Sequence, residues 1–391
     1  MFSDRTNWKL TRNGLTDALE EVRSSGARVL DLTISNPTRV GLHFDDARIL
    51  ASLASPRAMN YDPQPQGLPS ARAAVANYYR AQHGIAGLDL ARLILTTSTS
   101  EGYAFVFRLL CNPGDELLVP KPSYPLFEFL ADLQDVKLVP YPLIYDHGWQ
   151  MDFPSLEKVV TRQTRGVVVV HPNNPTGSYV HAHEQESLNV FCAERGLAII
   201  ADEVFLDYAH SGAPRPSFVA NQDVLSFTLS GISKISALPQ MKLAWIVTSG
   251  PAAQRDAAGE RLEVIADTYL SMNAPIQWAT PALLEQRQSL QPQLLNRVLG
   301  NLTQLDQQLA AQKMCQRLNV EGGWYAVLRV PVRQTDEELA VDLLRRKSVL
   351  VHPGHFYDFP SDGYLVLSLI VAESQFAEGI KRLLELIVVD H

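Results

Sequence analysis

Cysteine is scarce in this chain, and its few cysteines lie far apart. The three, Cys111, Cys192 and Cys315, form no CxxC pair. Widely separated thiols are typical of proteins in a reducing compartment and do not indicate a disulfide framework. We therefore expect free thiols in the interior and no metal site.

An excess of positive charge and a long apolar run are also missing. The chain has 34 Lys and Arg against 42 Asp and Glu, a net charge of −8, which argues against a nucleic-acid or anionic-membrane surface. No run approaches the length needed to cross a bilayer. Asp4 and Lys9 lie where a signal peptide needs an apolar core. We expect a cytoplasmic protein with no nucleic-acid or membrane partner.

Internal repeats and low-complexity segments are absent as well. With 391 residues, 46% of them hydrophobic and 19% charged, the chain has the composition of a soluble globular protein of two domains. We expect an N-terminal segment (residues 1–50) that packs on the small domain. A large domain (51–270) and a small C-terminal domain (271–391) would follow it.

Strand-like and helical patterns alternate through the middle of the chain. The strand-like runs are residues 92–97, 115–120, 166–172, 197–203, 225–230 and 243–250. Continuous apolar strands separated by helices predict an α/β fold with a mostly parallel sheet covered on both faces. Loops that leave the strand C-termini would carry the ligand.

The pattern changes after residue 250. Long helical stretches at 251–270 and 284–316 are followed by a strand in GGWYAVLRV and a helix in DEELAVDLLRRK. Two more strands follow, in VLVHPG and YLVLSLI. This order predicts the smaller α+β domain.

Three chemically distinct residues stand in an informative order. Asn174 begins an Asn-Pro-Thr-Gly turn, Asp202 ends the apolar run LAIIAD, and Lys234 ends Ser-Gly-Ile-Ser-Lys. An amine that can form an imine, a carboxylate that can pair with a pyridinium and an amide at a loop tip together indicate a pyridoxal phosphate (PLP) site. Asp202 precedes Lys234 by 32 residues, which fits one crossover between neighbouring parallel strands.

These motifs resemble the class I/II aminotransferases of the type I PLP-dependent fold, the aspartate aminotransferase-like superfamily. The resemblance runs from about Asp31 to Ser368. It implies a seven-stranded-type, mostly parallel sheet and a smaller C-terminal domain. It also implies that Lys234 holds PLP as a Schiff base and moves the proton at the substrate Cα. Asp202 would pair with the ring nitrogen, and Asn174 would donate to the ring 3-oxygen.

Hydroxyl groups near the predicted helix that begins at LTTSTSEGY match the family's phosphate contacts. Ser98, Thr99 and Ser100 lie between a strand and this helix. A helix N-terminus suits an anion, while a simple Ser/Thr N-cap is the compatible alternative. Ser230 and Ser233 would lie near the same edge, although the family's hydroxyl three residues before the lysine is Gly231 here.

Two tyrosines extend the resemblance. Tyr124, in Pro-Ser-Tyr-Pro, matches the aromatic residue that stacks on the pyridine ring, although a core aromatic is the plainer interpretation. Tyr61 resembles the tyrosine that reaches a phosphate across the dimer interface. The resemblance therefore implies a homodimer with shared active sites.

Three positions depart from the family. Val366 stands where an arginine usually clamps the substrate α-carboxylate, and valine cannot replace that bidentate contact. Lys242 stands where a phosphate-binding arginine is expected; it keeps the charge but loses the planar fork. Phe205 replaces a tyrosine that would donate to the 3-oxygen.

Substrate contacts are the least determined part of the site. Ser35 occupies the place of a glycine in the family's substrate loop, and Arg39 lies close by in sequence. Arg39 and His355 are the candidates to replace the missing arginine. A solvated surface charge and a loop-packing histidine are the simpler interpretations of these two residues.

The leading function is an aminotransferase of amino-acid metabolism, which moves an amino group from an amino acid or other primary amine to a 2-oxo acid. A PLP-dependent carbon–sulfur β-lyase is the alternative, because the same residues serve both reactions. A non-catalytic PLP-binding relative is a third. A PLP-dependent regulator with an N-terminal DNA-binding domain is disfavoured, because the motifs begin near residue 31 and the chain is acidic.

We predict that Lys234→Ala leaves a folded protein that cannot hold PLP covalently. Borohydride treatment of the wild type should fix PLP to the peptide that contains Lys234, as peptide mass spectrometry would show. Label on any other lysine would contradict the assignment.

Overall fold

Eight strands form the central sheet of this computed structural model, which describes residues 1–8, 11–211 and 215–389. β3, β4, β6, β7 and β8 pair in parallel, β9 runs antiparallel between β2 and β8, and β5 forms a hairpin with β4. The predicted mostly parallel sheet is thus confirmed, with β5 as an additional short strand. In sheet order the strands are β2 (Leu93–Thr96), β9 (Ala244–Ser249), β8 (Ser226–Gly231), β7 (Ala198–Asp202), β6 (Thr164–Val170), β3 (Glu116–Lys121), β4 (Lys137–Tyr145) and β5 (Trp149–Met151).

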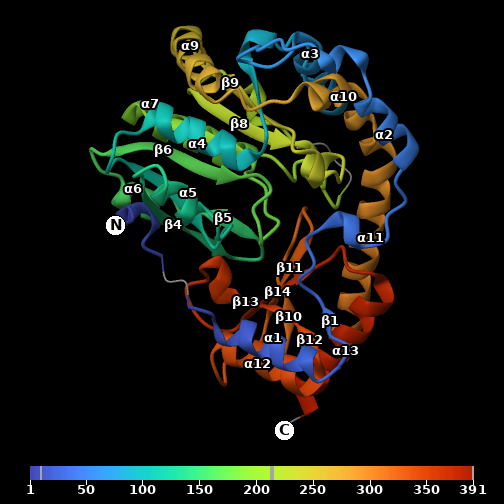
Figure 1. Cartoon of the computed structure of the whole chain (residues 1–391). Coiled ribbons are helices and arrows are strands. Elements are labelled where there is room, and N and C mark those ends of the chain that lie inside the picture. Colours follow the sequence, from blue (N-terminus) through green and yellow to red (C-terminus); the bar gives the residue numbers. More distant parts are fainter. Residues whose placement is uncertain (9–10, 212–214, 390–391) are drawn as a thin grey trace.

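Helices cover both faces of this sheet and also build much of the C-terminal part of the chain, residues 271–389 (Figure 1). No helix within the described ranges is long and apolar enough to cross a membrane. The helices are α1 (Gly14–Ser24), α2 (Asp46–Leu53), α3 (Pro69–His83), α4 (Thr99–Leu110), α5 (Phe127–Asp132), α6 (Phe153–Val159), α7 (Ala182–Arg195), α8 (Ile232–Ile235), α9 (Ala252–Tyr269), α10 (Ala274–Glu285), α11 (Arg287–Leu309), α12 (Asp336–Lys347) and α13 (Glu373–Val389).

The side-chain alternation of the central strands divides their apolar runs between two cores. Val168 and Ile200 pack with residues of α4, α5 and α9, whereas Val167 and Ile199 pack with residues of α6 and α7. Successive residues of a strand point to opposite faces, so a continuous apolar run buries both faces at once. The four residues are at most 1% exposed, as this arrangement requires.

β4 was not predicted from the sequence, because Pro140 and Pro142 lie within it. Proline lacks the N–H group that a ladder needs and is normally confined to edge strands. β5 pairs with β4 only at residues 143–145, so the two prolines lie where that flank of β4 has no partner strand. On its other flank β4 pairs with β3 in parallel over its first six residues.

The C-terminal part has its own four-stranded antiparallel sheet, and the N-terminal segment packs on it. β1 (Leu30–Asp31) pairs in parallel with β12 (Val349–Leu350), and α1 lies beside α12 (Figure 1). Leu15, Ala18 and Val22 of α1 belong to the same core as α12 and α13. In sheet order, the strands of the four-stranded sheet are β10 (Gln316–Arg317), β11 (Tyr325–Arg329), β14 (Tyr364–Ser368) and β13 (His352–Pro353).

The helical stretch expected at 284–316 is wrong at both ends. α10 ends at Glu285, α11 begins at Arg287 and ends at Leu309, and the chain then turns into β10. The side chain of Gln312 accepts hydrogen bonds from the backbone N–H groups of Met314 and Cys315, at 2.6 and 2.8 Å. A side chain that takes up backbone donors in this way competes with the helix.

Gly177 connects the Asn-Pro-Thr-Gly turn to the segment that precedes β11. Its carbonyl oxygen accepts from the N–H groups of Glu321 and Gly322, at 3.2 and 3.0 Å. Its φ is +68°, and a Cβ here would come within 2.5 Å of the Gly322 carbonyl oxygen. Glycine is therefore required both by the backbone conformation and by the close approach.

We predict that Gly177→Ala lowers the free energy of unfolding by roughly 2–4 kcal/mol, because a strained φ and a backbone clash add. Gly84→Ala is the matched control, since Gly84 has φ +69° but nothing within 4 Å of an added Cβ. That control should cost only about 1 kcal/mol, the strain of the backbone conformation alone. Urea denaturation of both variants measures the difference, and equal losses would contradict the clash.

Candidate active site

The carboxyl ends of six strands lie at one edge of the central sheet. β3, β4, β6, β7 and β8 are parallel, and β2 has the same direction because β9 is antiparallel to both β2 and β8. A cavity of about 170 Å³ lies at this edge. Its lining includes Ser35, Thr99, Ser100, Tyr103, Tyr124, Leu130, Asn174, Asp202, Val204, Phe205, Ser233, Lys234 and Tyr325.

Strand alternation sends the two adjacent acidic residues at the end of β7 to different sides. Asp202 has the parity of Ile200, which faces α4, and its carboxylate lies against Tyr103 of α4. Glu203 faces the other way and accepts from the Ser217 hydroxyl and the Phe218 N–H, each at 2.6 Å. Asp202 therefore serves the cavity and Glu203 the packing of a loop.

The Asp202 carboxylate is buried, with 7% exposure, and is held by one donor on each oxygen. The Tyr103 hydroxyl donates to Oδ2 at 3.0 Å and the Val204 N–H donates to Oδ1 at 3.1 Å. Burial raises the pKa of Asp202 to about 6, while these two hydrogen bonds and the Lys234 charge oppose the rise. The carboxylate thus remains mostly charged at neutral pH.

Lys234 lies in α8, directly after β8, so its backbone is fixed by the strand that neighbours β7. Its Nζ lies 4.9 Å from the ring centroid of Trp324 and 5.4 Å from that of Phe205. Burial lowers the pKa of Lys234 to about 8, against the opposing effect of Asp202. A lysine with such a pKa is present in both protonation states near neutral pH.

Side chains of two other segments hold the short helix α8 by hydrogen bonds to its backbone carbonyls. The Tyr208 hydroxyl donates to the backbone carbonyl of Lys234 at 2.7 Å, and Gln291 Nε2 donates to that of Ile235 at 2.9 Å. Gln291 also donates to Asp207 at 2.6 Å. Because Gln291 lies in α11, the position of Lys234 depends on a helix that reaches the C-terminal part.

Asn174 lies on the loop that follows β6, and hydrogen bonds of its neighbour Asn173 stabilise this loop. Asn173 Nδ2 donates to the Pro122 carbonyl at 3.0 Å and to Thr176 Oγ1 at 2.9 Å. Asn174 itself is 8% exposed, and its buried Oδ1 has no hydrogen-bond partner among the described residues. Its amide lines the cavity with unmet hydrogen-bonding capacity, and an amide can present oxygen or nitrogen from the same position.

The three hydroxyl residues predicted at the start of α4 have two different roles. Ser98 is the N-cap, with its Oγ accepting from the Glu101 N–H at 3.1 Å. Thr99 and Ser100 in the first turn line the cavity, where the helix N-terminus favours an anion. The two expectations for this segment, N-cap and anion site, thus apply to different residues.

The two serines near Lys234 also differ. Ser233 lines the cavity. Ser230 is buried, and its hydroxyl donates to the Glu203 carbonyl at 3.3 Å, away from the cavity lining. Tyr124 lines the cavity with its ring against Phe127 (centroids 5.8 Å apart), and burial raises its pKa to about 12.

These residues fit PLP. The cavity provides an amine, a carboxylate, an amide with an unsatisfied oxygen and a helix N-terminus, each on a different element that ends at the same sheet edge. The amine can bind the aldehyde, and the carboxylate can pair with the ring nitrogen. The helix N-terminus suits the phosphate, and the Asn174 amide can meet the ring oxygen.

Besides Ser98 and Ser230, four predicted residues lie outside the cavity lining. Lys242 and Arg39 are exposed, at the ends of the 3₁₀ segments Pro239–Met241 and Pro37–Arg39. The side chain of His355 is 46% exposed and lies 3.8 Å from Glu337 of α12. Tyr61 is 81% exposed. Within its own chain, none of the four contributes to the cavity, and their cofactor and substrate roles stay predictions.

The substrate side of the cavity is poor in charge. No residue of β14 is a cation, and Val366 is buried between β11 and β13 with 1% exposure. Lys234 is the one Lys or Arg side chain in the cavity lining that the structure describes. Ser35 and Tyr325 form the polar part of this side.

Tyr103, Tyr325, Leu130 and Val204 were missed by sequence reasoning. Tyr103 lies four residues after Thr99, one turn along α4, so helical spacing places it on the face that leads from the cavity into the core. Nothing in the sequence distinguished it from the other aromatic residues of that helix. The other three residues depend on contacts between distant segments.

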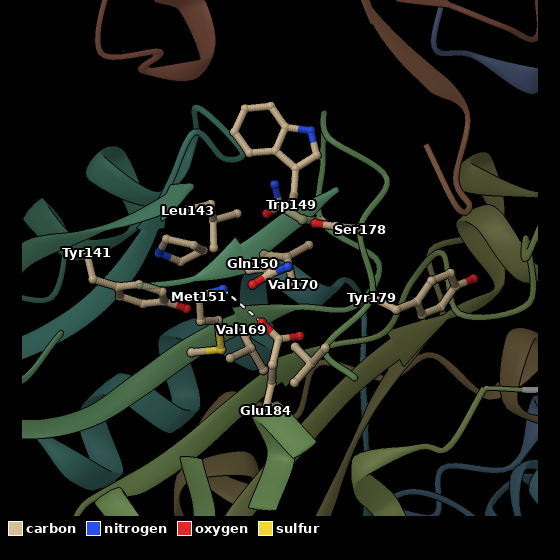
Figure 2. A pocket seen from close by; sticks show the side chains of 13 residues that line it. Tyr141, Leu143, Trp149, Gln150, Met151, Val169, Val170, Ser178, Tyr179 and Glu184 are labelled. Carbon is tan, nitrogen blue, oxygen red and sulfur yellow. Dashed lines mark hydrogen bonds between the residues drawn. The ribbon is translucent and has the colours of Figure 1, made fainter. Parts of the chain in front are cut away.

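A second cavity, on the α7 side of the sheet, is too small for a cofactor. Figure 2 shows it between β4, β5 and β6, with Tyr141, Trp149 and Glu184 around it. Its volume of about 20 Å³ has room for about one water molecule. Glu184 is used there to accept from the Met151 N–H at 2.8 Å.

Comparison with known sequences finds one family over most of the chain. The model of aminotransferase class I and II matches residues 27–382. A glutamate-pyruvate aminotransferase AlaA from Haemophilus influenzae is 27% identical over 93% of this chain and 91% of its own length. The AlaA protein of Escherichia coli K12 is 30% identical over 69% of this chain and 67% of its own length.

The fold agrees with solved structures of the same class. An alanine aminotransferase from Pyrococcus furiosus superimposes with a TM-score of 0.88 and 22% identity, covering 99% of both chains. At that identity the likeness supports the fold, and the matched sequence family supports the chemistry of the cavity.

We predict that Asp202→Asn stabilises the cofactor-free chain at alkaline pH. The carboxyl's ordinary pKa of 3.8 rises to about 6 on folding, so its contribution is present below 3.8 and lost as the pH rises through 6. The variant should exceed the wild type by about 1–3 kcal/mol at pH 8 and by much less at pH 4.

Asp152→Asn is the control of opposite sign. Asp152 caps α6, and its hydrogen bonds with Ser155 hold its pKa below the ordinary value, so its removal should gain nothing at pH 8. Urea denaturation at both pH values measures the two differences. An Asp202→Asn gain that is the same at pH 4 and pH 8 would show that charge burial is not its cause.

Proposed function

The chain belongs to the class I and II aminotransferase family, and we propose that it transfers an amino group from alanine to a 2-oxo acid, with Lys234 as the amine that carries PLP. The juxtaposition of Lys234, Asp202 and Asn174 in one cavity is the observation on which this proposal rests. Alanine is suggested by relatives that are named alanine or glutamate-pyruvate aminotransferases.

When bound, PLP supplies an aldehyde that takes up the substrate amine and a protonated ring that accepts negative charge from the substrate Cα. Asp202 would hold the proton on the ring nitrogen, because a buried carboxylate favours a neighbouring positive charge. Its two hydrogen bonds, from Tyr103 and Val204, fix its direction without any movement during reaction.

Lys234 would remove and return the proton at Cα. Its pKa of about 8 lies close to neutral pH, where a base can both accept and release a proton. The rings of Phe205 and Trp324 beside its Nζ limit access of water to the amine. The backbone carbonyl of Lys234 is held by Tyr208, so the amine can move while its helix stays in place.

The remaining groups would hold the cofactor. Thr99 and Ser100 would bind the phosphate with the N-terminus of α4, and Ser233 would add a hydroxyl. Asn174 would meet the ring 3-oxygen, and Tyr124 would lie against the ring face. Phe205 offers no donor to that oxygen, so Asn174 would be its partner on this side.

Substrate recognition would differ from a clamp by arginine. Val366 leaves β14 without a cation, and Ser35 and Tyr325 offer hydrogen bonds in place of a charge pair. A second carboxylate, as in aspartate or glutamate, would meet no arginine in this cavity. A small donor such as alanine makes the fewest demands on such a site.

We infer that two copies form a homodimer in which Tyr61 reaches the partner's phosphate site, and that the protein acts in the cytoplasm in amino-acid metabolism. Tyr61 and Met59 are more than four-fifths exposed, at 81% and 87%. Tyr61 also lines a hollow of about 490 Å³ with Arg57 and Trp278. Exposed large apolar side chains, such as these two, beside a hollow are typical of an interface between subunits.

A screen of the PLP-loaded enzyme against single amine donors tests the substrate proposal. Loss of the bound-cofactor absorbance in stopped flow should be at least about tenfold faster with alanine than with aspartate, glutamate or tyrosine, because one unmatched charge or bulky group costs about 1–3 kcal/mol. Lys234→Ala should give no reaction with any donor. A fastest reaction with aspartate would contradict the specificity, and release of pyruvate with ammonia from a cysteine conjugate would favour β-elimination.

A further inference from the structure

Tyr103 is a buried tyrosine whose single polar side-chain group is directed at the cavity's carboxylate. It is 2% exposed, and its ring packs edge-on against Phe107 and Phe127, with centroids 5.7 and 5.3 Å away. Its hydroxyl donates to Asp202 Oδ2 at 3.0 Å. Burial raises the pKa of Tyr103 well above the usual value, so the hydroxyl keeps its proton and remains a donor.

The two donors on Asp202 define the direction of its free lone pairs. Tyr103 binds one carboxylate oxygen from α4, and the Val204 N–H binds the other from the chain just after β7. Each carboxylate oxygen can accept about two hydrogen bonds. With one donor fixed on each oxygen, rotation of the carboxylate is blocked and the remaining lone pairs are available to the cavity.

We propose that Tyr103 is a positioning residue for the cofactor, which keeps Asp202 ionised and oriented so that its carboxylate can pair with the pyridine nitrogen of PLP. The inference rests on the proposed role of Asp202. Tyr103 acts through Asp202, and its hydroxyl supplies the only side-chain hydrogen bond to that carboxylate among the described residues.

The charge of Asp202 depends on a small set of neighbours. Lys234 of α8 and the Tyr103 hydroxyl favour the ionised form, whereas burial disfavours it. Glu203, the residue that follows β7, and Tyr124 after β3 also lie closely enough to Asp202 to affect its titration or be affected by it. Removing the phenol oxygen subtracts one favourable hydrogen bond, so protonation of Asp202 should move to higher pH.

Tyr103→Phe tests the proposal because the ring and its packing remain. We expect the apoprotein to bind PLP roughly ten- to a hundredfold more weakly at pH 7, the effect of a lost hydrogen bond to a charged group. The acid limb of the PLP-binding profile and that of kcat should both move up by about one pH unit.

Tyr141→Phe is a matched control. Tyr141 is 1% exposed, and its hydroxyl donates to the Val168 carbonyl at 2.8 Å beside the small cavity of Figure 2, away from the site. It also loses one buried hydrogen bond, so its thermal stability should fall as much as that of Tyr103→Phe or more. Its PLP affinity and the pH of its acid limb should equal those of the wild type.

A second substitution acts in the opposite direction and needs no loss of the hydroxyl. Incorporating 3-fluorotyrosine in place of Tyr103 makes the phenol a stronger donor, so the acid limb should move to lower pH. If Tyr103→Phe does not fold, this shift alone decides the question. An unmoved limb in the fluorinated protein would overturn the proposal.

Asp202→Asn separates this inference from the proposed function. If Asp202→Asn keeps wild-type PLP affinity and activity, the role of Asp202 itself is wrong. If Asp202→Asn is impaired but Tyr103→Phe matches Tyr141→Phe in affinity and acid limb, only the role of Tyr103 is wrong. Impairment of both, with the limb of Tyr103→Phe shifted upward, supports both proposals.

Discussion

Burial of the Asp202 charge is the constraint on which the active site depends. A carboxylate at 7% exposure carries a large desolvation cost, which its two hydrogen bonds and the nearby Lys234 amine only partly offset. The parallel pairing of β7 with β8 is what brings these two groups together, because both strands end at the same edge of the sheet. A cavity that binds a cofactor with a positive ring would complete the compensation. The fold thus maintains an unfavourable charge where a ligand can use it.

Much of this arrangement could be predicted from sequence. The order of Asn174, Asp202 and Lys234 after apolar runs was sufficient to place them at one sheet edge, since parallel strands separated by a single crossover end side by side. The strand at 137–145 was missed because Pro140 and Pro142 disguise it, and the helix that periodicity extended to residue 316 ends earlier, where Gln312 takes up backbone donors. The local sequence pattern therefore identified the strands that are buried on both faces of the sheet. It failed where single residues, such as the two prolines and Gln312, change the backbone hydrogen bonding.

Contacts across the cavity were less predictable. Tyr103 carries no sequence signal beyond its place on an apolar helix, and its role follows only from the contact of α4 with the end of β7. Lys242 and Arg39 were expected near the cavity because of their positions in the sequence, yet both are exposed. Position in the chain does not fix the direction of a long flexible side chain. Val366 shows the converse: a departure from the family was visible in the sequence, and the structure shows a β14 with no cation to replace the arginine.

The hydrogen bond from Gln291 to the helix of Lys234 couples α11 mechanically to the amine. The N-terminal turns of this helix hold the Ile235 carbonyl, while residues farther along it, such as Val298 and Leu305, are buried in the core of the C-terminal part. A helix is stiff along its axis, so a rotation of the C-terminal part cannot occur without a torque on the turn that bears the amine. The same lever works in reverse: whatever fixes the amine also resists that rotation.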